Sequence, residues 1–450
     1  MSSKSTQGSK LSPKKDQFSN SGFILAAIGS AVGLGNMWKF PYITGQYGGA
    51  AFFLLFVVCL VAVGLPVLLA ELAIGRGGRG SASSSFVKLG GSRAWGRMGM
   101  LPVIGPFMIL SFYAVVAGWT LHYAVKAFSG QLFVNTDFAG QFNGFMSGYM
   151  PIVWQVIVLL ITGWIVARGI SGGIEKFNKV LIPGLLVLLI VLMVRALTLQ
   201  GAGEGVSFFL NPDFSRLTPE STLVALGHAF FSLSLGMGTM ITYGAYVDKK
   251  QSLGAATLAI GGGDLLYALI AGLIIFPTTF SFGIDQAQGP GLVFVALPAA
   301  FSAMPLGSLF GGLFFVLLAI AALTSAVSLL EVPVAFVMER WGWSRTRAVW
   351  VLTVLCFILG VPSALSLGNV SSLTFGGKAF FDWLDFLASN VLLPLSGLLA
   401  TLFAGYFWKN VADEVGLKAG WFKVWLFALR FVAPILVLLV FLHSAGILKI

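Results

Sequence analysis

Residues 29–42 of the chain read GSAVGLGNMWKFPY and lie within its first long apolar segment. Gly29, Gly33 and Gly35 fall in the middle of that segment, and Pro41 follows them. Each interior glycine disfavours a helix by about 1 kcal/mol relative to alanine, so the stretch predicts a helix that is interrupted midway. Inside a bilayer, an unwound backbone is tolerated only where protein or a ligand satisfies its polar groups. The alternative explanation is close packing of two helices through the glycines.

A second apolar segment carries a matching interruption. It reads SLSLGMG at residues 232–238, and its Gly236 lies about 203 residues after Gly33. The two breaks occupy corresponding places in two possible five-helix halves. Paired glycine-interrupted segments of this kind are the sequence feature that best indicates the substrate site of a membrane transporter. The pair therefore favours a binding site over packing alone.

The composition is that of a polytopic helical membrane protein. Hydrophobic residues make up 57% of the 450 residues and charged residues only 10%, whereas soluble proteins carry about 25% charged residues. An ordinary soluble enzyme and a disordered chain are thereby excluded. A spanning helix needs roughly 20 apolar residues. Eleven segments are predicted to span the membrane: 21–45, 50–74, 101–128, 152–168, 176–199, 221–246, 254–281, 307–338, 347–364, 380–408 and 422–445.

Basic residues are distributed asymmetrically between these segments. With the N-terminus placed inside, 20 of the 27 lysines and arginines fall in the tail and the even-numbered loops, as the positive-inside rule requires. Eleven spans then place the C-terminus outside. This distribution accounts for the net charge of +11 without a nucleic-acid partner. Cys59 and Cys356 lie in apolar runs and the three histidines are scattered, so neither a disulfide nor a metal cluster is predicted.

The fifth segment has an interruption of its own. Gly173 and Pro183 frame nine residues at its cytoplasmic start, and a proline removes one helical hydrogen bond and clashes with the preceding turn. We predict a hinge that unwinds to admit water from inside; an ordinary kink is the alternative.

Three separated motifs resemble one family. The stretch at 29–42, FFSLSLGMGTMITYGAYV at 230–247 and LTSAVSLLEVPVAF at 323–336 are similar to the neurotransmitter:sodium symporters and occur in that family's order. The resemblance, to the bacterial amino-acid transporter branch, implies an all-α polytopic membrane protein with eleven transmembrane helices. It also implies a 5+5 inverted repeat with broken first and sixth helices, an architecture of which this family is itself a standard example. The implied organisation is a cytoplasmic tail at 1–17 and a single transporter domain at 18–450, with repeats at 18–200 and 220–410 and an eleventh helix at 421–445.

The resemblance implies a function as well. It predicts sodium-coupled symport of hydrophobic L-amino acids, aromatic and branched ones included, by alternating access, and no enzyme activity. The expected location is the bacterial inner membrane, and the expected partners are the amino acid and the lipid bilayer. A proton-coupled amino-acid transporter of the same fold is the alternative. Such a relative would typically lack the hydroxyl pair Thr324 and Ser325, which this chain keeps.

A substrate site follows from the resemblance. Half-helix ends at the breaks would offer N–H groups to a carboxylate and carbonyl oxygens to an ammonium. Tyr113 matches the family's tyrosine whose hydroxyl binds the carboxylate. Met237 stands where many relatives carry phenylalanine, and a flexible methionine can adapt to different hydrophobic ligands. The implied substrate-binding residues are Ala31, Leu34, Gly35, Ile109, Phe112, Tyr113, Phe231, Ser232, Ser234, Met237, Ser325 and Leu329.

Two sodium sites are also implied, and their ligands are all oxygens, which suits a hard cation. Asp264 stands where many relatives carry asparagine. Phe56, Ala268 and His228 replace the tyrosine, serine and glutamine found at these positions in chloride-dependent animal members. We therefore expect Asp264 to supply the negative charge and transport to be independent of chloride. The implied ligands are Ala31, Asn36, Ser232 and Asp264 for the first ion, and Gly29, Val32, Ala321, Thr324 and Ser325 for the second.

Gates are expected where opposite charges face each other at the membrane surfaces. Lys39 and Asp385 would close the outside. Glu339 would close the inside by pairing with Lys15 or its neighbour Lys14. Because surface ion pairs contribute only about 0–1 kcal/mol, such gates could open readily.

Overall fold

The computed structural model describes residues 16–285, 292–368, 370, 373–444 and 446–448. In this part of the chain, nine helices are long and apolar enough to span a membrane. They are Ala50–Gly78 (α3, Ala50–Cys59; η2, Leu60–Gly64; α4, Leu65–Gly78), Arg93–Phe128 (α6, Arg93–Met98; α7, Leu101–Phe128), Met150–Ala167 (α9), Ile170–Leu197 (η4, Ile170–Glu175; α10, Lys176–Leu197), Leu253–Ser281 (α14), Gly307–Trp341 (α16), Arg345–Ser366 (α17), Phe380–Phe407 (α18, Phe380–Asp385; η8, Phe386–Leu392; α19, Leu393–Leu402; η9, Phe403–Phe407) and Ala419–His443 (α21, Ala419–Phe427; η10, Ala428–Val432; α22, Ala433–Ser444).

The first and sixth predicted spans are broken helices, as expected. The first consists of α1 (Asn20–Ala31) and a second half made of η1 (Gly35–Lys39) and α2 (Phe40–Gln46), and the two halves are bent by 44°. The sixth consists of α12 (Pro219–Ser232) and α13 (Thr239–Ala245), which are separated by residues 233–238. Each half is too short to cross a bilayer alone. The polytopic all-α fold with broken first and sixth helices is therefore confirmed.

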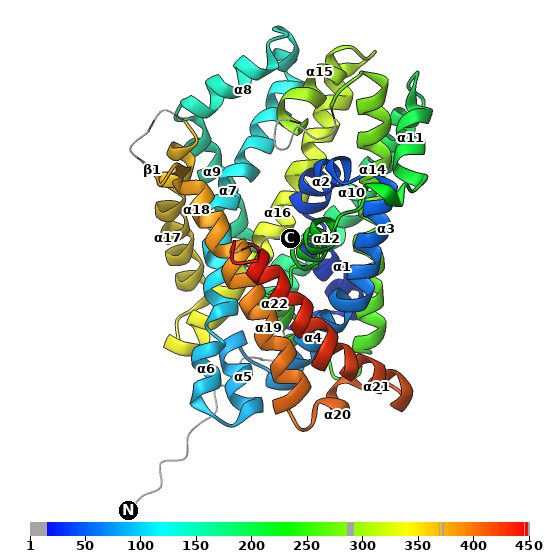
Figure 1. Ribbon diagram of the computed structural model, residues 1–450. Coiled ribbons are helices and arrows are strands. Elements are labelled where there is room, and N and C mark those ends of the chain that lie inside the picture. The colour runs from blue at the N-terminus through cyan, green and yellow to red at the C-terminus, as the bar shows by residue number, and fades with distance from the viewer. Residues whose placement is uncertain (1–15, 286–291, 369, 371–372, 445, 449–450) are drawn as a thin grey trace, which may run out of the picture.

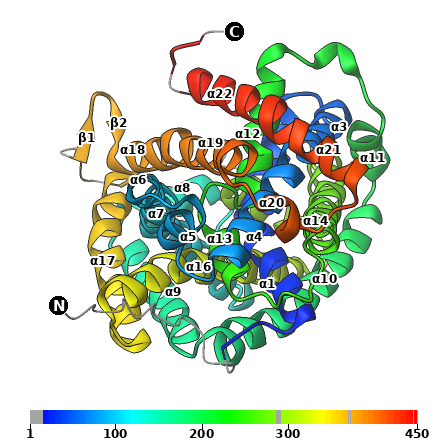
Figure 2. The ribbon, with the colours of Figure 1, turned by 90° about the horizontal axis from the view of Figure 1, so that it is seen from below.

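Burial distinguishes inner from outer helices. In its most apolar stretch α16 is 83% buried, whereas Ile170–Leu197 is only 28% buried and faces outward. Figure 2 shows α1, α4, α13 and α16 toward the middle of the bundle and α9, α10 and α17 at its edge. α16 packs directly against α7 and α1. The two broken helices are therefore surrounded by protein, which is the condition under which an unwound backbone is tolerated at membrane depth.

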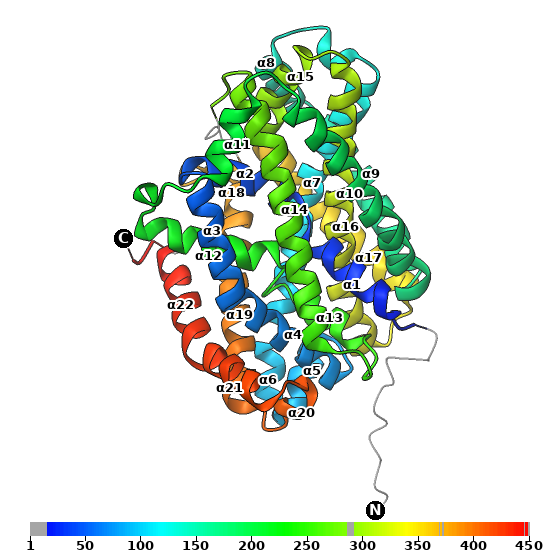
Figure 3. The ribbon, with the colours of Figure 1, turned by 90° about the vertical axis from the view of Figure 1, so that its right-hand side faces the viewer.

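Short elements cover both ends of the bundle (Figures 1 and 3). One end carries α8 (Phe138–Ser147), α11 (Ala202–Leu210), η6 (Leu292–Ala296) and α15 (Leu297–Ser302), with the turns η3 (Gln131–Phe133) and η5 (Phe214–Arg216) in the same connections. The other end, which we call the basic face, carries α5 (Ala82–Gly90), α6 and α20 (Val411–Val415). A small antiparallel hairpin joins β1 (Thr374–Phe375) to β2 (Lys378–Ala379). Its turn has positive φ at Gly376 and Gly377, as tight hairpin turns require.

Candidate functional site

The break in the first helix leaves backbone groups without helical partners. After α1 ends at Ala31, the N–H of Gly33 donates to the Ala31 carbonyl (3.0 Å) and the N–H of Leu34 donates to the Tyr113 hydroxyl (3.4 Å). The Ser30 carbonyl instead accepts from the hydroxyls of Ser234 (2.9 Å) and Ser325 (3.3 Å). The break is therefore bridged by side chains from α7, α16 and the sixth span. A helix end at which N–H and C=O groups are available can receive both ends of a zwitterion.

Glycine is required at the break in the sixth helix. Gly236 and Gly238 have φ angles of 74° and 65°, and a Cβ at these positions would lie closer than 3.0 Å to the Leu393 carbonyl and the Pro102 carbonyl, respectively. The freed N–H of Gly236 donates to the buried Glu71 carboxylate (2.8 Å). Glu71 of α4 thus holds the break in place.

A small cavity lies between the two breaks. It has a volume of about 20 Å³, which is room for a water molecule but not for an amino acid, so the site must widen to bind one. Ten of the twelve predicted substrate residues line it: Ala31, Leu34, Gly35, Ile109, Tyr113, Phe231, Ser234, Met237, Ser325 and Leu329. Ser30, Gly33 and Ser328 also line it and were missed; the Ser30 and Ser328 hydroxyls lie 2.8 Å apart.

Two predicted lining residues point elsewhere. Phe112 packs edge-on against Phe381 (5.3 Å between ring centroids), because the face of α7 that meets the cavity carries Ile109 and Tyr113, one turn apart. Ser232 is turned away from the cavity toward Asp264, in the polar cluster described next. Phe112 and Ser232 therefore do not line the cavity in this structure. Both stay predictions as substrate contacts, because the site must widen to bind an amino acid, and Ser232 is also a candidate ion ligand.

Three of the four residues predicted for the first sodium ion, Asn36, Ser232 and Asp264, form a buried cluster. One carboxylate oxygen of Asp264, Oδ1, accepts from Asn36 Nδ2 (2.7 Å) and from Ser232 Oγ (2.7 Å). The Ser232 and Asn36 side-chain oxygens are 3.2 Å apart. The second carboxylate oxygen, Oδ2, is buried and has no hydrogen-bond partner in the part of the chain that the structure describes. An unpartnered buried carboxylate oxygen is costly, and this oxygen-only donor set is suited to a hard cation.

The residues predicted for the second ion come from two helices. Gly29 lies in α1 and Val32 caps its C-terminal end, whereas Ala321, Thr324 and Ser325 lie in α16. The Thr324 hydroxyl donates to the Ala321 carbonyl (3.0 Å), so its lone pairs stay free to accept a cation.

Asn178 of α10 is a residue near this set that sequence reasoning missed. Its Nδ2 donates to the Ile174 carbonyl (2.9 Å), and its buried Oδ1 has no partner. A Cβ on Gly29 would clash with that oxygen, so Gly29 is also the residue that lets α10 approach α1. The sequence signal that could have identified Asn178 is its position, as a polar residue near the start of a helix that faces the lipid.

The outer charges predicted to pair do not do so here. Among the described residues, Lys39 lies over the Phe231 ring (5.0 Å from Nζ to the centroid), and Asp385 accepts from the Ser389 hydroxyl (2.8 Å). Lys39 and Phe231 also line a wider pocket of about 180 Å³ between α12, α19 and α22. Phe231 lines both this pocket and the central cavity and therefore separates them.

The inner end carries a charge cluster that the sequence analysis did not predict. Glu331 binds Arg345 through both carboxylate oxygens (2.7 and 3.0 Å) and accepts from the Tyr246 hydroxyl (3.1 Å). Asp16 lies 3.9 Å from Arg345 and accepts from the Ile170 N–H (2.9 Å). This cluster ties the chain before α1 to α16, α17 and η4.

Glu339, predicted as the inner gate, lies apart from that cluster and contacts α5, as described below; Lys14 and Lys15 lie outside the described residues. The predicted hinge is wound in this structure: Gly173 lies in η4, and α10 continues through Pro183. The Tyr267 hydroxyl donates to the carbonyl of Ile182 (2.8 Å), the residue that directly precedes Pro183.

Broken helices that face each other around a central cavity, within a polytopic helical fold, define a membrane transporter. No cluster of three or more His, Cys, Asp or Glu side chains suited to a catalytic metal occurs in the described part of the chain. The chain belongs to the sodium:neurotransmitter symporter family, whose sequence model matches residues 15–139 and 141–449.

Relatives agree with this assignment. An uncharacterized sodium-dependent transporter of Bacillus subtilis, YhdH, is 41% identical and covers 95% of this chain and 97% of its own length. The sodium-dependent serotonin transporter of Drosophila melanogaster is 27% identical over 94% of this chain and 75% of its own length. The crystal structure of MhsT in complex with L-phenylalanine superimposes with a TM-score of 0.89 at 47% identity, over 96% of this chain and 100% of that chain. The chain is thus a sodium-dependent transporter by family.

Proposed function

We propose that this chain is a sodium-coupled, chloride-independent symporter of hydrophobic L-amino acids that works by alternating access. The observation that carries the proposal is the central cavity: two helix breaks and the Tyr113 hydroxyl line it, and no charged side chain does. Such a lining binds a zwitterion through backbone ends and a hydroxyl, and disfavours a charged amino-acid side chain. L-Phenylalanine, the amino acid in the MhsT complex, is of the class proposed.

The proposal includes two sodium ions bound by the two oxygen sets. If the substrate carboxylate completes the first set, each ligand binds more weakly without the other, which is the basis of coupling. Moving one charge through 100 mV is worth about 2.3 kcal/mol, and a tenfold gradient adds about 1.4 kcal/mol per ion. Two ions supply roughly 7 kcal/mol, enough for about 10⁵-fold accumulation of a neutral solute.

Chloride independence rests on Asp264 and on its surroundings. His228 packs against Phe56 (5.1 Å between ring centroids) and stacks on Phe40 (5.5 Å). Aromatic rings offer a chloride ion no hydroxyl donors, whereas the Asp264 carboxylate provides a fixed negative charge. We place the protein in the bacterial inner membrane, with the basic face and the N-terminus in the cytoplasm, on the positive-inside rule.

Uptake into proteoliposomes tests the proposal. Labelled Phe, Leu, Trp, Tyr and Ala are compared under a sodium gradient and a choline control, both without chloride. We expect sodium-dependent uptake of the hydrophobic members. Uptake that ignores sodium and follows a proton gradient would contradict the ion assignments and favour a proton-coupled transporter.

A matched pair of variants tests the substrate site in the same assay. Tyr113→Phe removes a hydroxyl that contacts the first break and should raise KM about tenfold, the cost of a hydrogen bond to a charged group. Tyr243→Phe removes a buried hydroxyl that has no partner and should leave KM unchanged. Equal KM values for the two variants would contradict the role of Tyr113.

A further inference from the structure

An open cleft of about 740 Å³ lies on the basic face, between α5, α6 and the end of α16. None of the residues predicted to bind the substrate or the two sodium ions lines it. Its polar lining is dominated by cations. The basic residues are Lys88, Arg93, Arg97 and Arg340, and Glu339 is the acidic residue that lines it.

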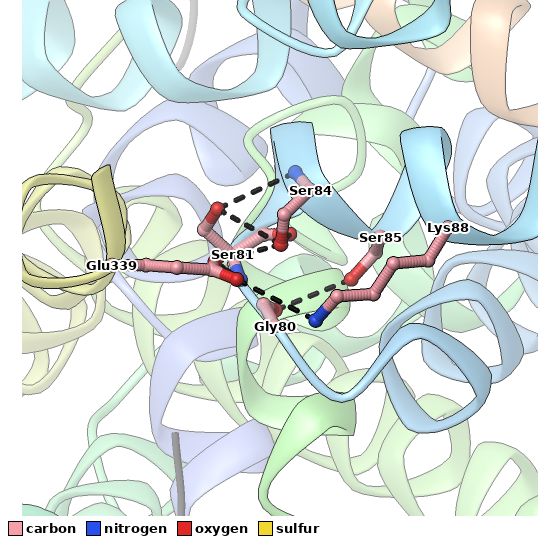
Figure 4. Close-up of polar contacts among 6 residues, drawn as sticks. All are labelled: Gly80, Ser81, Ser84, Ser85, Lys88 and Glu339. Carbon is pink, nitrogen blue, oxygen red and sulfur yellow. Dashed lines mark hydrogen bonds and ion pairs between the residues drawn. The ribbon is translucent and has the colours of Figure 1, made fainter. Parts of the chain in front are cut away.

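The hydrogen bonds of Glu339 are already satisfied within the protein. One carboxylate oxygen accepts from the Ser81 N–H and the Ser84 hydroxyl (2.7 Å each), and the other lies 3.5 Å from the Lys88 ammonium. Figure 4 shows the Glu339 carboxylate extending from α16 to the start of α5. The Lys88 side chain, which belongs to α5, extends back toward the same carboxylate. Glu339 therefore neutralises at most Lys88.

The three arginines are left uncompensated. Arg93, Arg97 and Arg340 are exposed, and within the described ranges none of them has an ion-pair partner. A neighbouring cleft on the same face provides a contrast, because its cations Arg76 and Lys249 are matched by Asp413 and Glu414. Of these two clefts, the arginine cleft is the one that carries an excess of cations.

The surroundings of the arginine cleft place it at the level of lipid headgroups. Large apolar residues that follow two of the arginines are exposed: Met98 (49%) after Arg97, and Trp341 (59%) after Arg340. Tryptophan gathers at membrane interfaces. α6 has no buried residue, and its Trp95 packs against Phe403 (4.8 Å) and Phe407 (4.9 Å) at the end of the tenth span. Val87, Met100 and Phe336 add apolar walls to the cleft.

We propose that the arginine cleft binds the phosphate headgroup of an anionic phospholipid. Guanidinium groups match phosphate oxygens with paired N–H donors, and basic pockets between helices at the membrane surface bind such headgroups. The apolar walls suit the first carbons of the acyl chains. The proposal depends on the membrane fold and not on the substrate.

Lipid retention measured by native mass spectrometry tests this proposal. The full chain is reconstituted in equimolar phosphatidylglycerol and phosphatidylcholine, and both lipids are counted after extraction into detergent. We expect the wild type to retain phosphatidylglycerol selectively. Each guanidinium contributes about a factor of ten through its hydrogen bonds to the charged phosphate, so Arg93→Gln/Arg97→Gln/Arg340→Gln should weaken retention by about a thousandfold, and Arg97→Gln alone by about tenfold.

A charge-matched control removes three exposed cations from elsewhere on the same face, Lys409→Gln/Lys418→Gln/Lys423→Gln, and should retain phosphatidylglycerol like the wild type. Equal losses in both triple variants would overturn the proposal in favour of general surface charge. Binding of inorganic phosphate to the lipid-free protein as tightly as phosphatidylglycerol would overturn the lipid as ligand. If the arginine triple variant fails to fold, the single variant decides, since α6 buries no side chain.

Discussion

Asp264 shows how much one side chain can decide in an apolar bundle. Its Oδ1 is committed to Asn36 and Ser232, while its buried Oδ2 is free. A neutral amide at this position would keep the hydrogen bonds available but remove the charge. The residue is therefore the natural test of the first ion set.

Asp264→Asn should lower sodium-dependent uptake at least about tenfold in chloride-free buffer, because an interaction with a charged group is lost. Asp248→Asn is the control, since Asp248 is exposed and bonds only its own turn at the Lys250 N–H. The measurement is the initial uptake rate of labelled phenylalanine at several sodium concentrations. Full activity of the Asp264 variant without chloride would refute the assignment.

At the scale of elements, the breaks depend on backbone that only glycine supplies. Gly236→Ala would place a Cβ against the Leu393 carbonyl, at a positive φ, and strain of this kind costs of order 1–3 kcal/mol. Gly262→Ala is the matched control: a Cβ there meets nothing within 4 Å, and alanine favours the α14 helix by about 1 kcal/mol. We expect the apparent Tm in detergent to fall for the first variant and not for the second. A fall in the apparent Tm of both variants would indicate that the bundle tolerates no added Cβ, whatever the φ angle of the glycine.

The buried ion pair between Glu331 and Arg345 joins α16 to α17 at the inner end of the bundle. Removing one member of a buried ion pair costs about 3–5 kcal/mol, because it leaves the other charge unpaired, whereas replacing both costs much less. Glu331→Gln and Arg345→Gln should therefore each lower the apparent Tm more than the double variant does. Arg216→Gln provides the comparison, since its pair with Asp213 is exposed and should leave the apparent Tm nearly unchanged. Additive losses in the double variant would contradict a direct pairing.

For the whole molecule, the proposed function makes substrate and sodium binding a single linked event, because the substrate carboxylate would complete the first ion set. Ligands that bind the folded state raise its stability by mass action, about 2.7 kcal/mol at 100 times Kd. We expect sodium and phenylalanine together to raise the apparent Tm by more than the sum of their separate effects, with choline replacing sodium in the control. Strictly additive shifts would show that the carboxylate is not shared with the ion.

The placement of the central site could be predicted from the sequence because its main signals are local. Glycines at positions 33, 35, 236 and 238 weaken a helix wherever they occur, and an apolar run of about 20 residues spans a bilayer whatever its neighbours are. The basic loops and the three motifs are also recognised from short stretches of sequence. The membrane fold and the two broken helices were therefore available from the residues alone, and most of the cavity lining followed from the family resemblance that the three motifs carry.

The tertiary structure decided what depends on how helices are rotated and which distant segments meet. Ile109 and Tyr113 face the cavity while Phe112 faces Phe381, a choice fixed by the rotation of α7 about its axis. Glu331 meets Arg345, Tyr246 and, through Arg345, Asp16, and these residues span more than 300 positions. The unpartnered oxygens of Asn178 and Asp264, and the arginine cleft, arise in the same way. Charge and hydropathy are properties of a residue, but a partner is a property of packing, and only the folded bundle brings these groups within bonding distance.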